Sequence, residues 1–316
     1  MGSFMSLVIP VYNEQDNLQY LYERIVKTLD PRKSIFEIIF VNDGSTDGSL
    51  DILKDLHGKD ARVKIVDLSR NFGHEIATSA GLRYAKGDVV VVMESDLQRP
   101  PEFIPVLLSK YEEGFDVVCA LRKQRRAESF YKVVVSKLFY RLINRIIEIR
   151  LPQDSTEFIL LNRKAVDAIL RFDENIRFFR GIVSWIGFKS AVVYYEEDSR
   201  YKGRSKYDLS GLLKLAVDII TGYSIKPLAF VTYTGFTVFL ASFVMILYYF
   251  IKTIVSGISF PGYASLMITI LMIGGVQLLS IGIIGQYIGR IYTETQRRPL
   301  YLVNDLIGIN DKDNAR

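Results

Sequence analysis

Two long stretches without a charged residue occupy most of the chain beyond residue 227. The first runs from Leu228 to Ile251 and the second from Thr253 to Gly289, with Lys252 between them. Phe, Val, Leu and Ile are frequent in both, and a helix of this length crosses about 30 Å of hydrocarbon. A buried hairpin of a globular protein is the alternative, which such long apolar runs disfavour. We therefore expect transmembrane helices at about 228–252 and 263–289.

Basic residues flank this hairpin on both sides. Residues 202–226 before it are rich in lysine and arginine, and Arg290, Arg297 and Arg298 follow it. Loops rich in these residues remain on the cytoplasmic side of a membrane. Both ends of the hairpin, and the residues that precede it, are therefore predicted to be cytosolic.

The chain is predicted to have three parts. Residues 1–225 form a cytosolic domain, 226–292 contain the two membrane helices, and 293–316 form a cytosolic tail that is polar and loose after Asp305. Cys119 is the single cysteine of the 316 residues, which excludes an internal disulfide framework and suits a reducing compartment.

Strand-like runs alternate with helical patterns in the first part. Five runs are predicted as strands. The first begins at Ser6, and the other four cover 35–41, 63–68, 89–93 and 116–121. Such alternation is typical of a parallel sheet built from βα units. No GxGxxG or GxxxxGK[ST] loop is present, so neither a dinucleotide site nor a Walker-type site is supported.

The fourth of these runs ends in a pair of carboxylates. Val89 to Met93 has the β-branched composition of a strand buried on both faces, and Glu94 and Asp96 follow it. Ligands of open α/β sheets bind at the carboxyl ends of strands, and acidic pairs there often hold a hard divalent cation. A strand that simply ends in a polar turn is the alternative, and the pattern alone leaves both open.

Four motifs in this order resemble the family 2 glycosyltransferases. They are PVYNE at 10–14, VNDGSTD at 41–47, LSRNFG at 68–73 and ESDLQRPPE at 94–102. The branch that the chain most resembles is the dolichol-phosphate mannose synthase-like enzymes, especially the bacterial polyisoprenyl-phosphate (bactoprenol) glucosyltransferases. The resemblance implies a GT-A (Rossmann-like) nucleotide-sugar domain with amphipathic interfacial helices and a C-terminal two-helix transmembrane hairpin.

The resemblance also implies donor-site residues. Those implied for the nucleotide are Pro10, Tyr12, Glu14, Asp43 and Ser95. Asp96, with Gln98 and Glu94, is implied as the ligand set for Mg²⁺ or Mn²⁺ on the diphosphate. A cation there neutralises charge that grows on the leaving nucleoside diphosphate. The family usually has aspartate at the position of Glu94, and the longer side chain shifts the geometry, so we rank Asp96 above Glu94.

A second implied set binds the acceptor phosphate. Its members are Arg122, Lys132, Ser136, Arg200, Arg204 and Lys206. Lys132 stands where the family has arginine, so a bidentate contact is lost. The glycine-containing loop at 200–207 can close over the diphosphate and the lipid phosphate. A basic juxtamembrane anchor without a catalytic role is the alternative.

Two basic amphipathic helices are expected at about 129–150 and 209–222. Such helices lie in the membrane interface with their basic face toward anionic headgroups. An ordinary solvated helix packed on the sheet is the alternative for the first of them.

The segment at 151–164 supplies the last implied residue, Glu157, which we group with Asp96 and Gln98 as catalytic. We expect Glu157 to orient the sugar or the acceptor. A phosphate monoester has a second pKa near 6, so the acceptor is already an oxyanion and hardly needs a general base. Trp185, within another matching segment, could stack on a sugar or pack half-buried.

Together these features predict a metal-dependent, inverting glycosyltransferase of the bacterial inner membrane. It would move one sugar, with glucose favoured, from a UDP-sugar to polyprenyl (undecaprenyl) phosphate at the cytosolic face, for later use in cell-envelope glycosylation. GDP-mannose or another UDP-sugar as the donor stays open, as does a non-catalytic membrane scaffold that keeps the fold. A processive polysaccharide synthase would need a QxxRW element and further spans, and neither is evident.

The chain is expected to associate with copies of itself and not with nucleic acid. Gly274, Gly275 and Gly282 permit close packing of helices, so a homo-oligomer is expected. Nucleic-acid binding fits poorly, because the basic residues lie beside the membrane spans, where lipid phosphate is the simpler partner.

Overall fold

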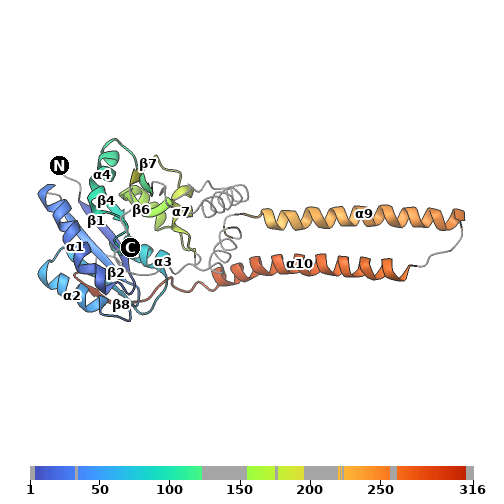
Figure 1. Cartoon of the computed structure of the whole chain (residues 1–316), viewed down its shortest axis with the longest axis horizontal. Helices are drawn as coiled ribbons and strands as arrows, with labels where there is room; N and C mark the ends of the chain where they lie inside the picture. Colours follow the sequence, from blue (N-terminus) through green and yellow to red (C-terminus); the bar gives the residue numbers. More distant parts are fainter. Residues whose placement is uncertain are drawn as a thin grey trace. The chain divides into compact units, whose positions relative to one another are not determined.

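The computed structural model in Figure 1 shows a domain built on a β-sheet and a pair of long helices. It describes residues 4–32, 35–122, 155–174, 177–195, 220, 222, 224–256 and 262–310. The expected interfacial helix at about 129–150 lies outside the described residues, as does nearly all of the one at 209–222.

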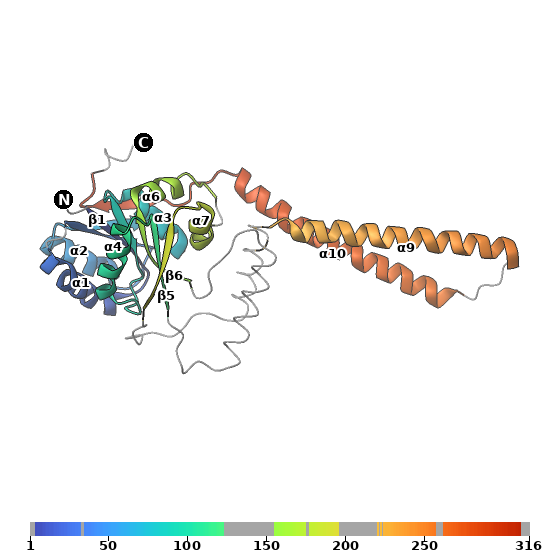
Figure 2. The same ribbon diagram turned by 90° about the horizontal axis from the view of Figure 1, so that it is seen from above.

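A mixed eight-stranded sheet has the order β7-β5-β6-β4-β1-β2-β3-β8, and Figure 2 shows β5 and β6 side by side in it. The strands are β1 (Met5–Val11), β2 (Phe36–Asn42), β3 (Val63–Leu68), β4 (Val89–Val92), β5 (Val117–Arg122), β6 (Ser155–Asn162), β7 (Ser190–Tyr195) and β8 (Val303–Ile307). All five predicted strands are present, and β1 to β4 pair in parallel as expected. β5 and β7 also pair in parallel, but the prediction of a parallel sheet is wrong at β6, which is antiparallel to β4 and β5, and at β8, which is antiparallel to β3.

Helices cover both faces of the sheet. On one face lie α1 (Gln15–Leu29), α2 (Ser49–Lys59) and α4 (Ile104–Glu112), and on the other α3 (His74–Tyr84), α6 (Arg163–Ile169) and α7 (Phe179–Trp185). Two short 3₁₀ helices, η1 (Asp30–Arg32) and η2 (Pro101–Phe103), complete this part. Every residue of β1, β2 and β4 is therefore buried, and β4 accordingly is a continuous apolar run.

Successive residues of a strand point to opposite faces, so the sheet divides its apolar side chains between two cores. Leu7 and Ile9 of β1 belong to the core under α1, and Val8 belongs to the core under α3. Helix α3 packs closely there because Gly81 has no Cβ: one added at this position would lie 2.3 Å from a methyl carbon of Val8.

The chain that follows the two long apolar helices returns to the edge of the sheet. β8 pairs with β3, and the Ser69 amide donates a 2.9 Å hydrogen bond to the Leu302 carbonyl. Leu306 and Ile307 pack against the two apolar cores. The expectation of a loose tail after Asp305 is thus wrong through Ile307, because these apolar side chains and the open edge of β3 both gain partners.

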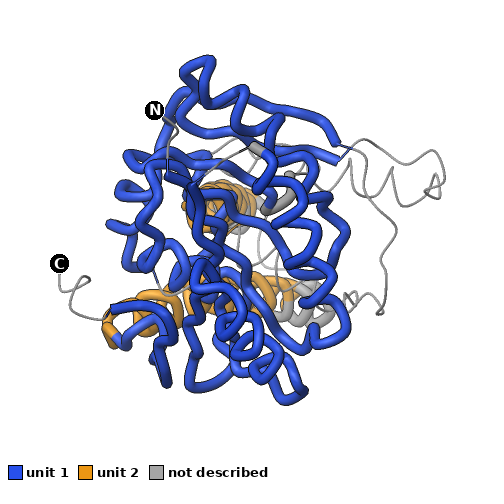
Figure 3. The backbone as a smooth tube through the Cα atoms, turned by 90° about the vertical axis from the view of Figure 1, so that its left-hand side faces the viewer, with its two compact units in different colours: residues 1–142, 149–208, 298–316 blue, residues 143–148, 209–297 orange. Residues whose placement is uncertain are grey.

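The structure divides into two compact units (Figure 3). One contains residues 1–142, 149–208 and 298–316, and the other contains residues 143–148 and 209–297. The second unit holds α9 (Lys226–Ser256) and α10 (Tyr263–Thr295), which include the predicted spans. Lys226–Met245 and Met272–Thr295 are long and apolar enough to cross a membrane, with mean hydropathies of 1.8 and 1.4.

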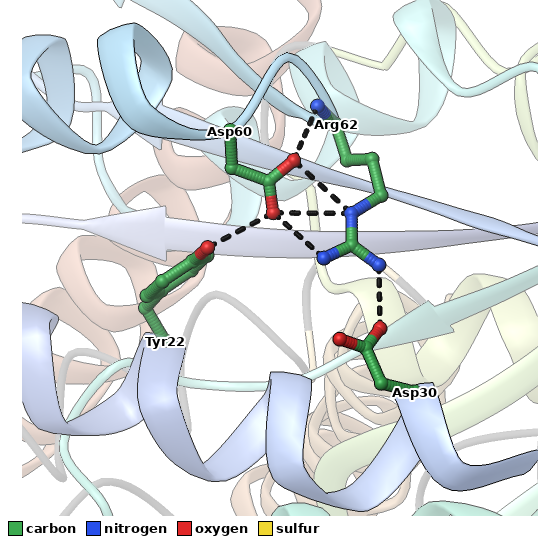
Figure 4. A network of polar contacts seen from close by, with 4 residues as sticks. All are labelled: Tyr22, Asp30, Asp60 and Arg62. Atoms are coloured by element: carbon green, nitrogen blue, oxygen red, sulfur yellow. Dashed lines mark hydrogen bonds and ion pairs between the residues drawn. The ribbon is translucent and has the colours of Figure 1, made fainter.

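A closed polar cluster joins α1, the end of α2 and the start of β3 (Figure 4). Arg62 Nη1 donates a 2.6 Å hydrogen bond to Asp30, and Arg62 Nε and Nη2 bind the carboxylate of Asp60. The Tyr22 hydroxyl donates a 2.9 Å bond to the same carboxylate. Burial alone would raise the pKa of Asp60, but the hydrogen bonds from Arg62 and Tyr22 outweigh it and lower that pKa.

Candidate active site

A cavity of about 270 Å³ opens at the carboxyl ends of β1, β2 and β4. It is lined by Pro10, Val11, Tyr12, Glu14, Asp43, Asn71, Gly73, His74, Glu94, Ser95 and Asp96. All five residues predicted for the nucleotide lie here, together with both predicted acidic metal ligands. They converge because β1 lies between β2 and β4 in the sheet, so that loops distant in sequence end at one edge.

Asp43 organises one wall of this cavity. Its carboxylate accepts hydrogen bonds from the backbone amides of Phe72 at 2.7 Å and Gly73 at 3.0 Å. Burial raises the pKa of the Asp43 carboxyl, and these two amides, with His74 and Arg70 nearby, act against that rise. Asp43 therefore holds the LSRNFG loop in place beside the cavity.

The turn after Asp43 packs tightly on the same loop. Gly44 has a φ of 63°, and a Cβ at this position would lie 2.4 Å from the backbone carbon of Arg70. Glycine alone fits this conformation and this close approach. Asp43 and Gly44 of the VNDGSTD motif thus both contact the LSRNFG loop.

Hydrogen bonds also join the β1 and β2 loops. The Asn13 amide donates to Ser45 Oγ at 3.1 Å, and the Thr46 amide donates to Asn13 Oδ1 at 2.8 Å. Asn13 lies between Tyr12 and Glu14, and its φ of 56° turns the chain at this point. Ser95 joins β4 to β1 through a 3.0 Å bond from its Oγ to the Pro10 carbonyl.

A buried arginine separates the two predicted acidic metal ligands. Arg99 is 7% exposed, forms an ion pair with Glu94, and places Nη1 3.6 Å from Asp96 Oδ1. Burial alone would lower the pKa of Arg99, but Glu94 and Asp96 outweigh it and raise that pKa. Asp96 Oδ1 also accepts a 3.1 Å bond from the Gln98 amide, in a turn where Leu97 has a φ of 63°.

Asp96 lies in the cavity and can offer a carboxylate oxygen to a divalent cation, whereas Gln98 is not among the residues that line it. Among the described residues, no three His, Cys, Asp or Glu side chains come together as a complete protein-made site. Mg²⁺ in nucleotide sites commonly takes only one or two protein oxygens, with water and phosphate oxygens as its other ligands, a requirement that Asp96 can meet. Arg99 pairs with Glu94 and also places Nη1 3.6 Å from Asp96 Oδ1, so it compensates both predicted carboxylate ligands.

Three residues that shape the site were not predicted from the sequence. Arg99 lies within the ESDLQRPPE motif, and its burial between two acids depends on how the turn folds. Asn71 and His74 line the cavity from the LSRNFG loop and the start of α3. The motif indicated this loop, but no sequence pattern indicated which of its side chains face the cavity.

The predicted acceptor residues lie mostly outside the described residues: Lys132, Ser136, Arg200, Arg204 and Lys206. Arg122 is the last residue of β5 and is half-buried. Glu157 lies in β6, and its side chain is not described. Trp185 is 62% exposed, with its ring edge-on to Phe172 at 5.2 Å, so it is not the half-buried packing residue of one expectation.

A larger hollow of about 630 Å³ lies over α1, away from the strand ends. It is lined in part by Arg24 and Glu102, which form a two-pronged ion pair with N–O distances of 2.9 and 2.6 Å. Glu102 closes the ESDLQRPPE motif but joins η2 to α1 instead of lining the smaller cavity. The motif therefore mixes cavity residues with a structural one.

Comparison with known proteins assigns the family. Residues 6–170 match glycosyl transferase family 2, and residues 226–291 match the GtrB C-terminal hairpin. The chain belongs to glycosyl transferase family 2. The first match includes every strand from β1 to β6 and the whole 270 Å³ cavity, and the second covers most of α9 and α10.

Relatives of this glycosyltransferase match it over nearly its full length. An uncharacterised glycosyltransferase of Synechocystis sp. is 45% identical over 96% of both chains. A bactoprenol glucosyl transferase of Shigella phage SfV is 38% identical, covering 95% of this chain and 98% of the relative. A prophage bactoprenol glucosyl transferase homolog of Escherichia coli K12 is 36% identical, with the same coverage. The fold, the family and the C-terminal hairpin are thus as predicted.

Proposed function

We propose that this glycosyltransferase transfers one sugar, most simply glucose, from a UDP-sugar to polyprenyl phosphate. The observation that carries the proposal is the cavity at the ends of β1, β2 and β4, where Asp43, Ser95 and Asp96 meet. Its sequence motifs belong to a family of sugar transferases, and relatives named for glucosyl transfer to bactoprenol match the chain from end to end.

The residues divide the chemistry between them. Tyr12, Glu14 and Asp43 are assigned to the nucleoside, and Asp96, with Gln98 in the same turn, would hold a divalent cation for the diphosphate. When bound, that cation offsets the negative charge that the departing diphosphate gains. Arg99 keeps Glu94 and Asp96 from repelling each other before the donor arrives.

The transfer itself is a single displacement with inversion. An oxygen of the lipid phosphate forms a bond to the anomeric carbon, and the bond from that carbon to the diphosphate oxygen breaks. The bonding electron pair leaves with UDP, and the acceptor needs no base because its phosphate is largely doubly ionised at neutral pH. Glu157 on β6 is assigned to orient the sugar or the acceptor.

Chain connectivity supports a membrane hairpin with both ends in the cytosol. The hairpin lies between β7 and β8 in the sequence, and both strands belong to one sheet. A sheet cannot extend across a bilayer, so the chain between these strands crosses the membrane an even number of times. Basic residues at both ends of the hairpin favour the cytosolic side. The enzyme is thereby held beside a lipid acceptor.

A turnover assay on the full-length protein in liposomes tests this proposal. Polyprenyl phosphate is offered with a panel of labelled UDP- and GDP-sugars and with Mg²⁺ or Mn²⁺. We expect a lipid-extractable product from a UDP-sugar, lost with a chelator and in Asp96→Asn. Glu102→Gln is the matched control, because Glu102 belongs to the same motif but lies outside the cavity.

The alternatives correspond to distinct results. Product from GDP-mannose, or from a UDP-sugar other than UDP-glucose, would keep the reaction and change the donor. Absence of product from every donor, with folded protein and acceptor present, would overturn the enzyme proposal and favour a membrane scaffold. Loss of activity in Glu102→Gln equal to that in Asp96→Asn would contradict the assignment of the cavity.

A further inference from the structure

The strand that follows the membrane hairpin reaches the donor site through a buried carboxylate. β8 pairs with β3, and Asn304 Nδ2 donates a 2.8 Å hydrogen bond to Asp67 Oδ2. Asp67 is 5% exposed, and its other oxygen accepts a 2.7 Å bond from Asn42 Nδ2. Two side-chain amides, one on each side of β3, thus bind the two oxygens of one buried carboxylate.

Asn42 connects Asp67 to the turn that carries Asp43. It is 2% exposed and directly precedes Asp43, and its Oδ1 accepts a 3.3 Å bond from the Ser45 amide. The bond to Asp67 holds the Asn42 amide group with Nδ2 toward β3 and Oδ1 toward the turn. A rotated amide would face Asp67 with an oxygen, which a carboxylate repels.

The turn that carries Asp43 also holds the loop that follows β1 and lines the nucleotide pocket. Ser45 Oγ accepts from the Asn13 amide, and the Thr46 amide donates to Asn13 Oδ1. Tyr12 and Glu14, which line the cavity, are the neighbours of Asn13. A continuous series of hydrogen bonds therefore runs from Asn304 through Asp67, Asn42 and Ser45 to the walls of the cavity.

We infer that Asn304 is a positioning residue for donor binding. The inference rests on the proposed function for the identity of the ligand, a nucleoside diphosphate, but not for the effect on the loops. Asn304 neither lines the cavity nor touches the donor. It acts by keeping a buried carboxylate fully bonded, which keeps Asn42 and the Asp43 turn in the orientation that the pocket requires.

The residue lies in a part of the chain where sequence gave no reason to look for the donor site. It is separated from Asp67 by 237 positions, with the whole membrane hairpin between them. The segment after the hairpin, which contains β8, thus supports the nucleotide site and also forms the edge strand beside β3.

Two measurements on Asn304→Ala test the inference. The first is hydrogen exchange of the Ser45 and Thr46 amides in the ligand-free protein, which needs no substrate. The second is the affinity for UDP with Mn²⁺, measured by calorimetry. We expect faster exchange at both amides and about tenfold weaker UDP binding, the effect of one lost hydrogen bond to a charged group. In turnover, the donor KM should rise more than kcat falls.

Asp305→Ala is the matched control, because Asp305 is exposed on the same strand and its side chain accepts from the amide of Leu306. It should leave both measurements unchanged. Asn304→Asp should weaken UDP binding more than Asn304→Ala, since it opposes two carboxylates. The double variant N304D/D67N should recover affinity, because an amide and a carboxylate again face each other while Asn42 keeps an oxygen acceptor.

Several outcomes would overturn the role inferred for Asn304 or the proposed donor. Wild-type exchange and wild-type affinity in Asn304→Ala would overturn the inference. Equal losses in Asn304→Ala and Asp305→Ala, without recovery in N304D/D67N, would also overturn it and indicate general weakening of β8. Failure of the wild type to bind any nucleoside diphosphate would overturn the proposed donor, while the exchange measurement would still show whether Asn304 holds the loops.

Discussion

The Arg62 cluster and the 270 Å³ cavity, two polar clusters of the first compact unit, differ in how far basic groups balance their carboxylates. In the Arg62 cluster, one guanidinium satisfies two carboxylates and a tyrosine supplies a further donor. The cavity has four carboxylate residues among its described lining residues, with His74 as the one basic residue there. Arg99 compensates part of that charge from beneath.

The difference separates a structural cluster from a binding site. The Arg62 cluster is complete and has no need of a ligand. An anionic nucleoside diphosphate, by contrast, cannot approach so many carboxylates unless a cation accompanies it. The charge surplus of the cavity is thus the physical reason for assigning a metal to Asp96. Four variants test this comparison, in order of decreasing effect.

Asp96→Asn should have the largest effect. It removes the carboxylate that we assign to the cation, so turnover should fall by about a thousandfold, or roughly 4 kcal/mol of transition-state stabilisation. Steady-state kinetics with a saturating UDP-sugar measure this. Glu94→Gln should cost less than tenfold, because Glu94 is paired with Arg99. A larger loss in Glu94→Gln than in Asp96→Asn would reverse our ranking of the two ligands.

Arg99→Met should destabilise the folded protein by about 3 kcal/mol, because it leaves Glu94 and Asp96 uncompensated in a buried site. Mn²⁺ should recover much of that loss by supplying the missing positive charge. Thermal unfolding with and without Mn²⁺ measures both effects. Arg24→Met is the control, since its partner Glu102 is 53% exposed and the pair should contribute less than about 1 kcal/mol. Equal destabilisation of the two variants would show that Arg99 is not compensating buried charge.

Asp60→Asn should cost about 1 kcal/mol, the usual contribution of such hydrogen bonds. The effect should depend on pH in a defined direction. Because the folded-state pKa of Asp60 is lowered, its contribution is complete above the ordinary value of 3.8 and is lost as the pH falls through the folded-state pKa. Denaturant titrations at pH 7 and near pH 3 should therefore show a smaller difference between wild type and variant near pH 3 than at pH 7. The same difference at both pH values would refute the assignment.

Tyr22→Phe should have the smallest effect, no more than about 1 kcal/mol, because Asp60 keeps its bonds to Arg62. Denaturant unfolding measures it, and a loss larger than that of Asp60→Asn would mean that the hydroxyl, and not Arg62, holds the cluster together.

Much of the parallel part of the fold followed from local pattern. Runs such as Val89 to Val92 are buried on both faces and therefore show as continuous apolar sequence. The direction of the antiparallel strands could not be predicted from local pattern. β6 follows β5 after a long stretch of sequence and β8 follows the two long apolar helices, and neither is preceded by a short βα unit that would indicate its direction.

The sequence by itself determined the family, the membrane-compatible helices and the residues that we assign to the donor, because each depends on a contiguous run or motif. Only the tertiary structure decided which of those residues share a cavity, that Glu102 does not, and that Arg99 separates Glu94 from Asp96. It alone placed Asn304 beside Asp67. Contacts between residues far apart in the chain are made by packing and charge balance in three dimensions, and neither leaves a periodic pattern in the sequence.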